Sequence, residues 1–168
     1  MTSSYRQSLP EVHLEIKLGI MDGRPIKHEV MLGAATVLAQ LSTCARRKVG
    51  CILTDVNGRI LSTGNNGVAK GLPHCIDHPC AGASCPSGTG LELCEAIHAE
   101  QNALMFCADV MKIHHCYVTC SPCVHCVKML LNTACREIHF MERYPSNAWE
   151  LWLSDKTAGR SWCHHGDD

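Results

Sequence analysis

Two short segments of the sequence hold three metal-binding side chains and one carboxylate. His98 and Glu100 lie in the first segment, and Pro122, Cys123 and Cys126 lie in the second. One imidazole and two thiolates give a zinc ion three protein ligands and leave a fourth, open position, which is typical of catalytic rather than structural zinc. A carboxylate beside zinc-bound water can accept its proton and pass it on without being a ligand. The spacing therefore predicts a hydrolytic zinc site with Glu100 as its proton acceptor.

The two cysteines are expected at the start of a helix. Ser121 is predicted to cap this helix and Pro122 to be its first residue, which places Cys123 and Cys126 in the first turn. Residues three apart lie on the same helical face, and the positive end of the helix dipole lowers the pKa of nearby thiols. This setting favours the thiolate form that a metal ion binds.

His98 is predicted to begin a helix over residues 98–110. His98 and Glu100 would diverge by about 200° on a regular helix, so they can act on one point only from the helix end. We therefore expect two helix starts, at His98 and at Cys123, to face each other across the zinc.

The rest of the chain predicts an α/β fold with a mixed sheet covered by helices on its faces. The expected elements are a helix at 28–41, strands at 48–54 and 59–64, a long loop at 65–93, strands at 116–119 and 136–141, and the two helices that carry the zinc ligands. Asn57-Gly58 predicts the hairpin turn between the first two strands. A length of 168 residues fits a single domain, with a core at about 28–145, an N-terminal extension at 1–27 and a tail at 146–168. The tail carries Trp149, Trp152 and Trp162, either against the core or between subunits.

Charge and hydropathy exclude some classes of protein. Fifteen Lys and Arg against sixteen Asp and Glu give no basic field, which disfavours polymeric nucleic acid as a partner. Residues 1–10 lack the apolar core of a signal peptide, and the longest apolar stretch, 30–41, is too short to cross a bilayer. We expect a soluble, cytoplasmic protein with no membrane partner.

Thirteen Cys and eleven His are an excess for this length. An odd number of cysteines without a secretion signal argues against a disulfide framework and favours metal binding. Several cysteines are expected to be ordinary packing residues because they lie in apolar segments, namely Cys51, Cys107, Cys116 and Cys135.

A second, structural zinc is predicted in the long loop. Cys44 and Cys75 are expected to meet, and Cys80 and Cys94 would complete four ligands that hold the loop in place. His74, His78 or Cys85 could replace one of them, and the absence of a second metal stays an open alternative because the spacings are irregular.

Several segments together resemble the cytidine deaminase superfamily, and within it the deoxycytidylate deaminases. They are STCARRKVG at 42–50, GNNG at 64–67, IHAEQNA at 97–103 and YVT at 117–119, followed by Pro122-Cys123. Together these segments are specific for the family. Taken singly, only the zinc motif is specific, and it is the signature already known for zinc deaminases. The resemblance covers most of 28–145 and implies a three-layer α/β/α sandwich. Asn65 departs from the family, which more often has an aromatic residue there, and 128–132 departs from the pattern of tRNA adenosine deaminases.

The resemblance implies hydrolysis of the C4 amino group of dCMP to give dUMP and ammonia, with Glu100 moving protons to N3 and to the leaving amine. It further implies substrate contacts from Arg46, Asn66, Ala99 and Tyr144. Without it, Arg46 would be solvated surface, Asn66 a turn residue and Tyr144 a packed aromatic. The family also implies a homo-oligomer, as a hexamer, with dCTP and dTTP as effectors.

Two other functions remain open at this point. A deaminase acting on cytosine or adenine within RNA or DNA would need phosphate tracks and stacking aromatics, of which this chain has few. A non-catalytic, zinc-stabilised regulatory module would have little use for Glu100.

Overall fold

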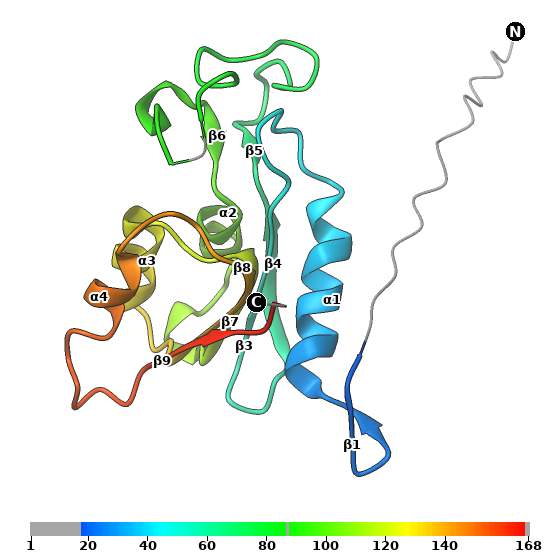
Figure 1. Cartoon of the computed structure of the whole chain (residues 1–168), viewed down its shortest axis with the longest axis vertical. Helices are drawn as coiled ribbons and strands as arrows, with labels where there is room; N and C mark the ends of the chain where they lie inside the picture. The colour runs from blue at the N-terminus through cyan, green and yellow to red at the C-terminus, as the bar shows by residue number, and fades with distance from the viewer. Residues whose placement is uncertain (1–17, 87, 167–168) are drawn as a thin grey trace, which may run out of the picture.

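A mixed five-stranded sheet in the order β4-β3-β7-β8-β9 forms the centre of the computed structural model, which describes residues 18–86 and 88–166 (Figure 1). The strands are β3 (Gly50–Thr54), β4 (Ile60–Asn65), β7 (His115–Cys120), β8 (Glu137–Glu142) and β9 (Ser161–His164). Strand β3 pairs antiparallel with both β4 and β7, whereas β7, β8 and β9 run parallel to one another. The sheet is therefore mixed, as predicted.

Helices cover both faces of this sheet. Helix α1 (Lys27–Ala39) lies on one face, and α2 (Ala99–Met105), α3 (Val124–Leu131) and α4 (Ala148–Trp152) lie on the other (Figure 1). Successive strand residues point to opposite faces, so Ile52 and Tyr117 pack under α1 while Leu53 and Val118 join the core under the other helices. The three-layer α/β/α sandwich is confirmed.

Smaller elements flank these layers. A hairpin of β1 (Ile20–Met21) and β2 (Arg24–Pro25) precedes α1, and β5 (Gly67–Val68) pairs with β6 (Ala96–Ile97) just before α2. Two 3-10 turns, η1 (Leu91–Leu93) and η2 (Val110–Lys112), complete the list. Within 18–86 and 88–166, none of the helices has the length and apolar character that crossing a membrane requires. Residues 1–17 of the predicted N-terminal extension lie outside the described part of the chain.

The predicted hairpin between β3 and β4 is confirmed. Asp55 Oδ1 accepts hydrogen bonds from the backbone N–H groups of Asn57 and Arg59, at 2.9 and 2.8 Å. Gly58 takes a positive φ of 78°, which glycine adopts without steric cost. Local turn chemistry was enough to locate this turn.

Two predicted helix boundaries are wrong. Helix α2 ends at Met105 rather than near residue 110, because Asp109 starts the turn η2 by accepting a hydrogen bond from the Met111 N–H. Helix α3 begins at Val124, so Ser121 is not its cap. Ser121 is instead tied to the end of β8, because its N–H donates to the Glu142 carbonyl and its hydroxyl accepts from the Tyr144 N–H.

Three of the four cysteines predicted to be packing residues, Cys51, Cys116 and Cys135, are fully buried, and Cys107 packs partly buried at the edge of the same core.

The tail, which had no predicted secondary structure, supplies α4 and β9. Trp152 is completely buried and its Nε1–H donates to the Ser161 carbonyl at 2.9 Å, while Trp162 packs beside Phe140. These two tryptophans cover the core, whereas Trp149 is about half exposed.

Gly64 of β4 allows α2 to approach the sheet closely. A Cβ atom at this position would lie 2.2 Å from the Ala99 carbonyl oxygen and 2.5 Å from the Ala103 nitrogen. Both atoms belong to the backbone of α2, so neither can move without moving the helix. Asn102 reinforces the contact, because its side-chain Nδ2 donates to the Asn65 carbonyl at 2.8 Å.

We expect Gly64→Ala to lower the free energy of unfolding by about 1–3 kcal/mol, because overpacking forces the backbone apart. Urea denaturation measures this loss. Thr63→Ala, on the exposed side of the same strand, is the control and should stay within about 0.5 kcal/mol of the wild type. Equal stability of the Gly64→Ala variant and the wild type would contradict the close approach.

Candidate functional site

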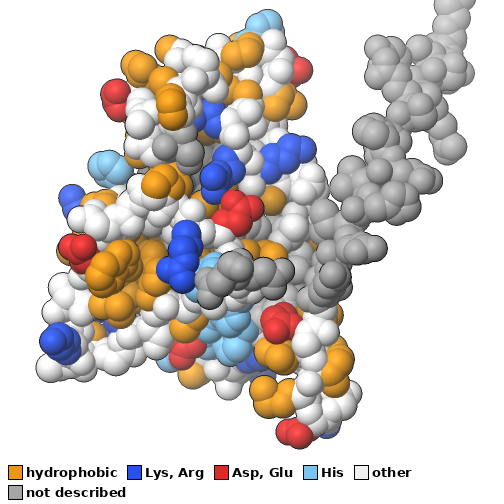
Figure 2. Space-filling model, viewed as in Figure 1, with side chains coloured by type: hydrophobic (Ala, Val, Ile, Leu, Met, Phe, Trp, Pro, Cys, Tyr) orange, Lys and Arg blue, Asp and Glu red, His pale blue; other side chains and the backbone are white. Residues whose placement is uncertain are grey.

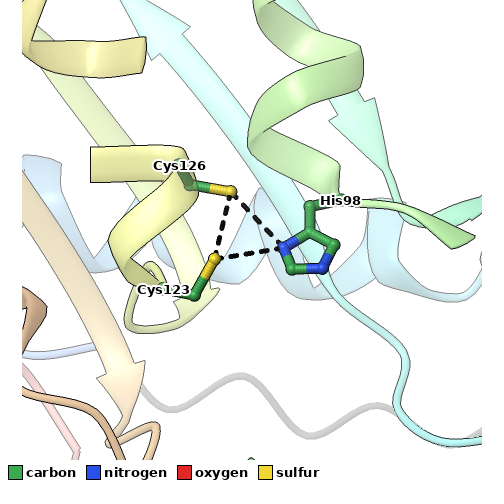
Figure 3. Close-up of side chains that lie close together, drawn as sticks. All are labelled: His98, Cys123 and Cys126. Atoms are coloured by element: carbon green, nitrogen blue, oxygen red, sulfur yellow. Dashed lines mark hydrogen bonds between the residues drawn. The ribbon is translucent and has the colours of Figure 1, made fainter. Parts of the chain in front are cut away.

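Three ligand atoms converge on one point between α2 and α3 (Figure 3). His98 Nδ1 lies 3.5 Å from Cys123 Sγ and 3.4 Å from Cys126 Sγ, and the two sulfurs are 3.8 Å apart. Ordinary Zn–N and Zn–S bonds in a tetrahedral site would place the nitrogen about 3.6 Å from each sulfur, and the sulfurs about 3.8 Å from each other. The donor set and its spacing therefore fit one zinc ion, with one position left over.

The ligands come from two helix starts, as predicted. His98 is the residue before the first turn of α2, Cys123 occupies the same place before α3, and Cys126 lies in the first turn of α3. Figure 3 shows the side chains pointing toward one another from the two helices. The backbone N–H of His98 donates to Gln101 Oε1 at 2.8 Å, which fixes the chain direction where the imidazole leaves it.

The two thiols share one negative charge beside the imidazole. Hydrogen bonds from Cys126 and His98 lower the pKa of Cys123 to about 3, while the bond to Cys123 and burial raise the pKa of Cys126. The contact with Cys123 also raises the pKa of His98. The site thus favours a thiolate, which is the form that binds a metal.

Glu100 lies one residue into α2, with only 4% of its surface exposed. Burial raises the pKa of its carboxyl group above the ordinary value. The charges of His98 and Cys123 act on it, so it lies close to the ligand triad without belonging to it. A buried carboxyl group with a raised pKa is suited to accept a proton and return it.

A cavity of about 280 Å³ opens above this triad. Glu100 and two of the ligands, His98 and Cys123, line it. All four residues predicted to contact substrate line it as well, namely Arg46, Asn66, Ala99 and Tyr144. Arg47, which was not among the predicted substrate residues, also lines the cavity, whereas Lys48 does not.

Both arginines have protein partners at the cavity wall. Arg46 Nη2 donates to three loop carbonyls, those of Cys85, Pro86 and Thr89, at 3.3, 2.8 and 2.9 Å. Arg47 Nη1 pairs with Glu142 Oε2 at 3.0 Å. Arg46 therefore holds the loop that borders the cavity.

Asn66 and Tyr144, which are far apart in the sequence, both line the cavity. Asn66 Oδ1 accepts from the Val49 N–H at 2.8 Å, and its Nδ2 donates to the Arg47 carbonyl at 2.7 Å. An amide side chain has two donors and two acceptor lone pairs, so one of each remains for a ligand. Burial raises the pKa of Tyr144, which therefore stays a neutral hydroxyl.

The cysteines predicted to form a second zinc site are only partly assembled. Cys75 Sγ and Cys80 Sγ lie 3.6 Å apart, and the Ile76 N–H donates to the Thr43 carbonyl, which joins the chain beside Cys75 to the chain beside Cys44. Among residues 18–86 and 88–166, the groups that bring three ligand atoms together are the triad and a set made of His114, His115 and Glu137. The sulfurs of the predicted second site are not such a group.

Comparison with known proteins gives the same family as the motif. The family model for the "Cytidine and deoxycytidylate deaminase zinc-binding region" matches residues 25–142. Deoxycytidylate deaminase of Mycobacterium phage D29 is 36% identical over 113 residues, covering 64% of this chain and 88% of that protein. Deoxycytidylate deaminase of Schizosaccharomyces pombe is 30% identical over 125 residues, covering 72% of this chain but 38% of that protein. The chain therefore spans about two fifths of the yeast relative.

Solved structures agree. The crystal structure of dCMP deaminase from the cyanophage S-TIM5 in complex with dCMP and dUMP superposes with a TM-score of 0.65 at 26% identity, over 82% of this chain and 95% of that one. The range matched by the family model includes His98, Glu100, Cys123 and Cys126. The chain belongs to the cytidine and deoxycytidylate deaminase zinc-binding family.

Proposed function

We propose that this protein hydrolyses dCMP to dUMP and ammonia. The observation that carries the proposal is a zinc-type ligand triad beside a buried, non-ligand carboxyl group, at the base of a cavity that two arginines line. Zinc held by His98, Cys123 and Cys126 supplies Lewis-acid chemistry, which lowers the pKa of water enough to make a nucleophile near neutral pH.

Glu100 moves the protons of the reaction. Hydrolysis adds the oxygen of one water at C4 and releases the C4 amino group as ammonia. Glu100 takes a proton from the attacking water and delivers it to N3 of the pyrimidine, then takes the proton of the new C4 hydroxyl and passes it to the departing amine. The carboxyl group ends the cycle as it began, so one residue suffices.

A nucleotide monophosphate suits this cavity better than a neutral nucleoside or a polymer. Arg46 and Arg47 bring two guanidinium groups to its wall, and guanidinium groups bind phosphate through charge-assisted hydrogen bonds. Asn66 keeps one donor and one acceptor for a sugar hydroxyl. The cyanophage relative was crystallised with dCMP and dUMP, which supports this choice.

A base within RNA or DNA is the weaker substrate candidate. The formal net charge is −1, whereas proteins that track nucleic acid use strong positive fields. A cavity of about 280 Å³ lies near the lower end of the range for small-molecule sites. A non-catalytic role would leave the burial of Glu100 without a purpose.

We also propose the second, structural zinc at Cys44, Cys75, Cys80 and Cys94. The Cys75–Cys80 separation of 3.6 Å is close to the spacing of two thiolates on one zinc ion. Burial raises the pKa of Cys94, and the charges of Cys44 and Cys80 add to this effect, so these sulfurs are neighbours. Binding requires Cys44 and Cys94 to close on the other pair, which would fix the loop over the cavity.

Homo-oligomerisation as a hexamer and regulation by dCTP and dTTP stay predictions from the family resemblance, and a cytoplasmic location stays a prediction from the sequence. Each can be measured on the purified protein or in cells.

Replacing Glu100 with Gln should lower kcat for dCMP by about 10²–10⁴-fold, because the amide cannot exchange a proton. Zinc content should stay near the wild-type value, since Glu100 is not a ligand. Ammonia release and zinc analysis measure the two effects. Glu92→Gln, an exposed carboxylate near the cavity, is the control and should behave as the wild type. Unchanged turnover in the Glu100→Gln protein would refute the proton transfer.

Arg46→Gln should lower kcat/KM for dCMP by about 10- to 100-fold, the size of one charge-assisted hydrogen bond. The loss for deoxycytidine should be smaller, because this substrate has no phosphate. Lys48→Gln is the matched control, since Lys48 is exposed and lies outside the cavity wall. Equal losses with both substrates would mean that Arg46 only supports the loop and does not bind phosphate.

Zinc analysis of dialysed protein tests the second zinc. We expect two zinc ions per chain in the wild type and one in Cys75→Ser, with the control Cys107→Ser at two, because Cys107 lies outside both proposed sites. One zinc per chain in all three proteins would remove the structural site and leave the catalytic one standing.

A further inference from the structure

A second group of ligand-type side chains lies at the start of the parallel strands. His114 precedes β7, His115 is its first residue, and Glu137 is the first residue of β8, directly paired with His115. The zinc triad follows the other end of β7, after Cys120. Five steps of about 3.3 Å separate His115 from Cys120, so roughly 17 Å of strand lies between this group and the catalytic end.

The ligand atoms of this group already face one another. His114 Nε2 lies 3.7 Å from Glu137 Oε1, and His115 Nε2 lies 3.8 Å from Glu137 Oε2. All three ligand atoms fall within 4.8 Å of one another. Zn–N and Zn–O bonds near 2.1 Å in a tetrahedral site would bring ligand atoms to about 3.4 Å. The two His–Glu separations lie within a few tenths of an ångström of that spacing, and the remaining ones are at most 4.8 Å.

The hydrogen bonds around His115 orient it as a ligand. Its Nδ1 lies 3.0 Å from the Asp55 carbonyl oxygen and 3.0 Å from the Thr54 hydroxyl, and a proton on Nδ1 satisfies the carbonyl, which only accepts. The lone pair of Nε2 then faces the carboxylate of Glu137. A ring proton donated to a backbone carbonyl is the arrangement that usually fixes metal-binding histidines.

Glu137 is held by a second histidine pair. His139 Nε2 donates to Glu137 Oε2 at 3.0 Å, and His139 Nδ1 lies 2.9 Å from His165 Nε2. The His28 ring stacks on His139 with centroids 4.2 Å apart. These contacts fix the carboxylate that bridges His114 and His115, as supporting hydrogen bonds do in metal sites.

The group is reachable from solvent. The His114 and Glu137 side chains are 30% and 32% exposed, while His115 is 8% exposed. Figure 2 shows histidine side chains gathered on the molecular face in the region of β8 and β9. Helix α1 packs mainly over β3 and β7, and its His28 ring lies 6.1 Å from that of His115, so the group is open to solvent on the side of His114 and Glu137.

We infer that His114, His115 and Glu137 form a second kind of metal site, which binds a zinc ion at the amino ends of β7 and β8. With both imidazoles protonated on Nδ1, three acceptors would converge on one point, which a single proton cannot serve and a metal ion can. Two imidazoles and one carboxylate are a donor set that zinc accepts, with one position left open to solvent. The site would clamp the starts of two core strands and is separate from the deamination chemistry.

Titration of dialysed protein with zinc tests this inference. We expect one further zinc equivalent per chain in the wild type. His114→Gln and Glu137→Gln should each weaken this binding by at least about tenfold. Removing a ligand lowers metal affinity more than removing a supporting hydrogen bond, which itself costs about tenfold or more. Glu150→Gln, an exposed carboxylate on α4, is the control and should bind as the wild type. The zinc retained after dialysis should be the same in all four proteins.

Histidine imidazole ¹H–¹⁵N correlation spectra of the wild type give a readout that does not depend on variant folding. Added zinc should shift the ring nitrogen signals of His114 and His115. Three results would each overturn the site. They are no further zinc binding to the wild type, further zinc binding in both site variants that is as tight as in the wild type, and unshifted His114 and His115 signals. In those cases the cluster is a hydrogen-bond and ion-pair network only.

Discussion

One constraint on this fold is that three zinc-type ligand atoms from two different helices must meet at one point. Zinc accepts an imidazole and two thiolates only when their atoms lie about 3.6–3.8 Å apart, and His98, Cys123 and Cys126 are 3.4–3.8 Å apart on two different helices. Two helix starts must therefore meet at one point. Any shift of α2 against α3 by more than a fraction of an ångström would separate the ligands, so the surrounding packing has to hold both helices firmly.

The sheet supplies that firmness. Gly64 lets the backbone of α2 approach β4 closely, and the Asn102 side chain binds the Asn65 carbonyl, so the helix that carries His98 and Glu100 is seated on the sheet edge. On the other side, β7 ends at Cys120 and the chain reaches Cys123 within three residues, while Ser121 binds the end of β8. The start of α2 is thus held against β4, and the start of α3 follows directly from the end of β7. The burial of Glu100 in the cavity wall follows from this placement, because Glu100 lies in the first turn of α2.

Sequence reasoning succeeded where a local chemical pattern decides the structure. The triad, Glu100 and the Asn57-Gly58 turn were all predicted, because ligand type and turn conformation depend on a few adjacent residues. It failed where distant contacts decide. Ser121 looks like a helix cap, but its hydrogen bonds to β8 place it outside α3. Strand β9 was missed because its pairing partner, β8, lies about twenty residues earlier and the short strand has no clear alternation of its own.

The histidine group at the other end of β7 shows the same limit. Glu137 lies more than twenty residues after His114 and His115, and the parallel pairing of β7 with β8 brings the three together.

The zinc site formed by His98, Cys123 and Cys126 can be tested directly. Anomalous diffraction at the zinc absorption edge tests it most directly. The account predicts a peak about 2.1 Å from His98 Nδ1 and about 2.3 Å from the sulfurs of Cys123 and Cys126. A crystal of active protein with no zinc peak at this point would contradict it.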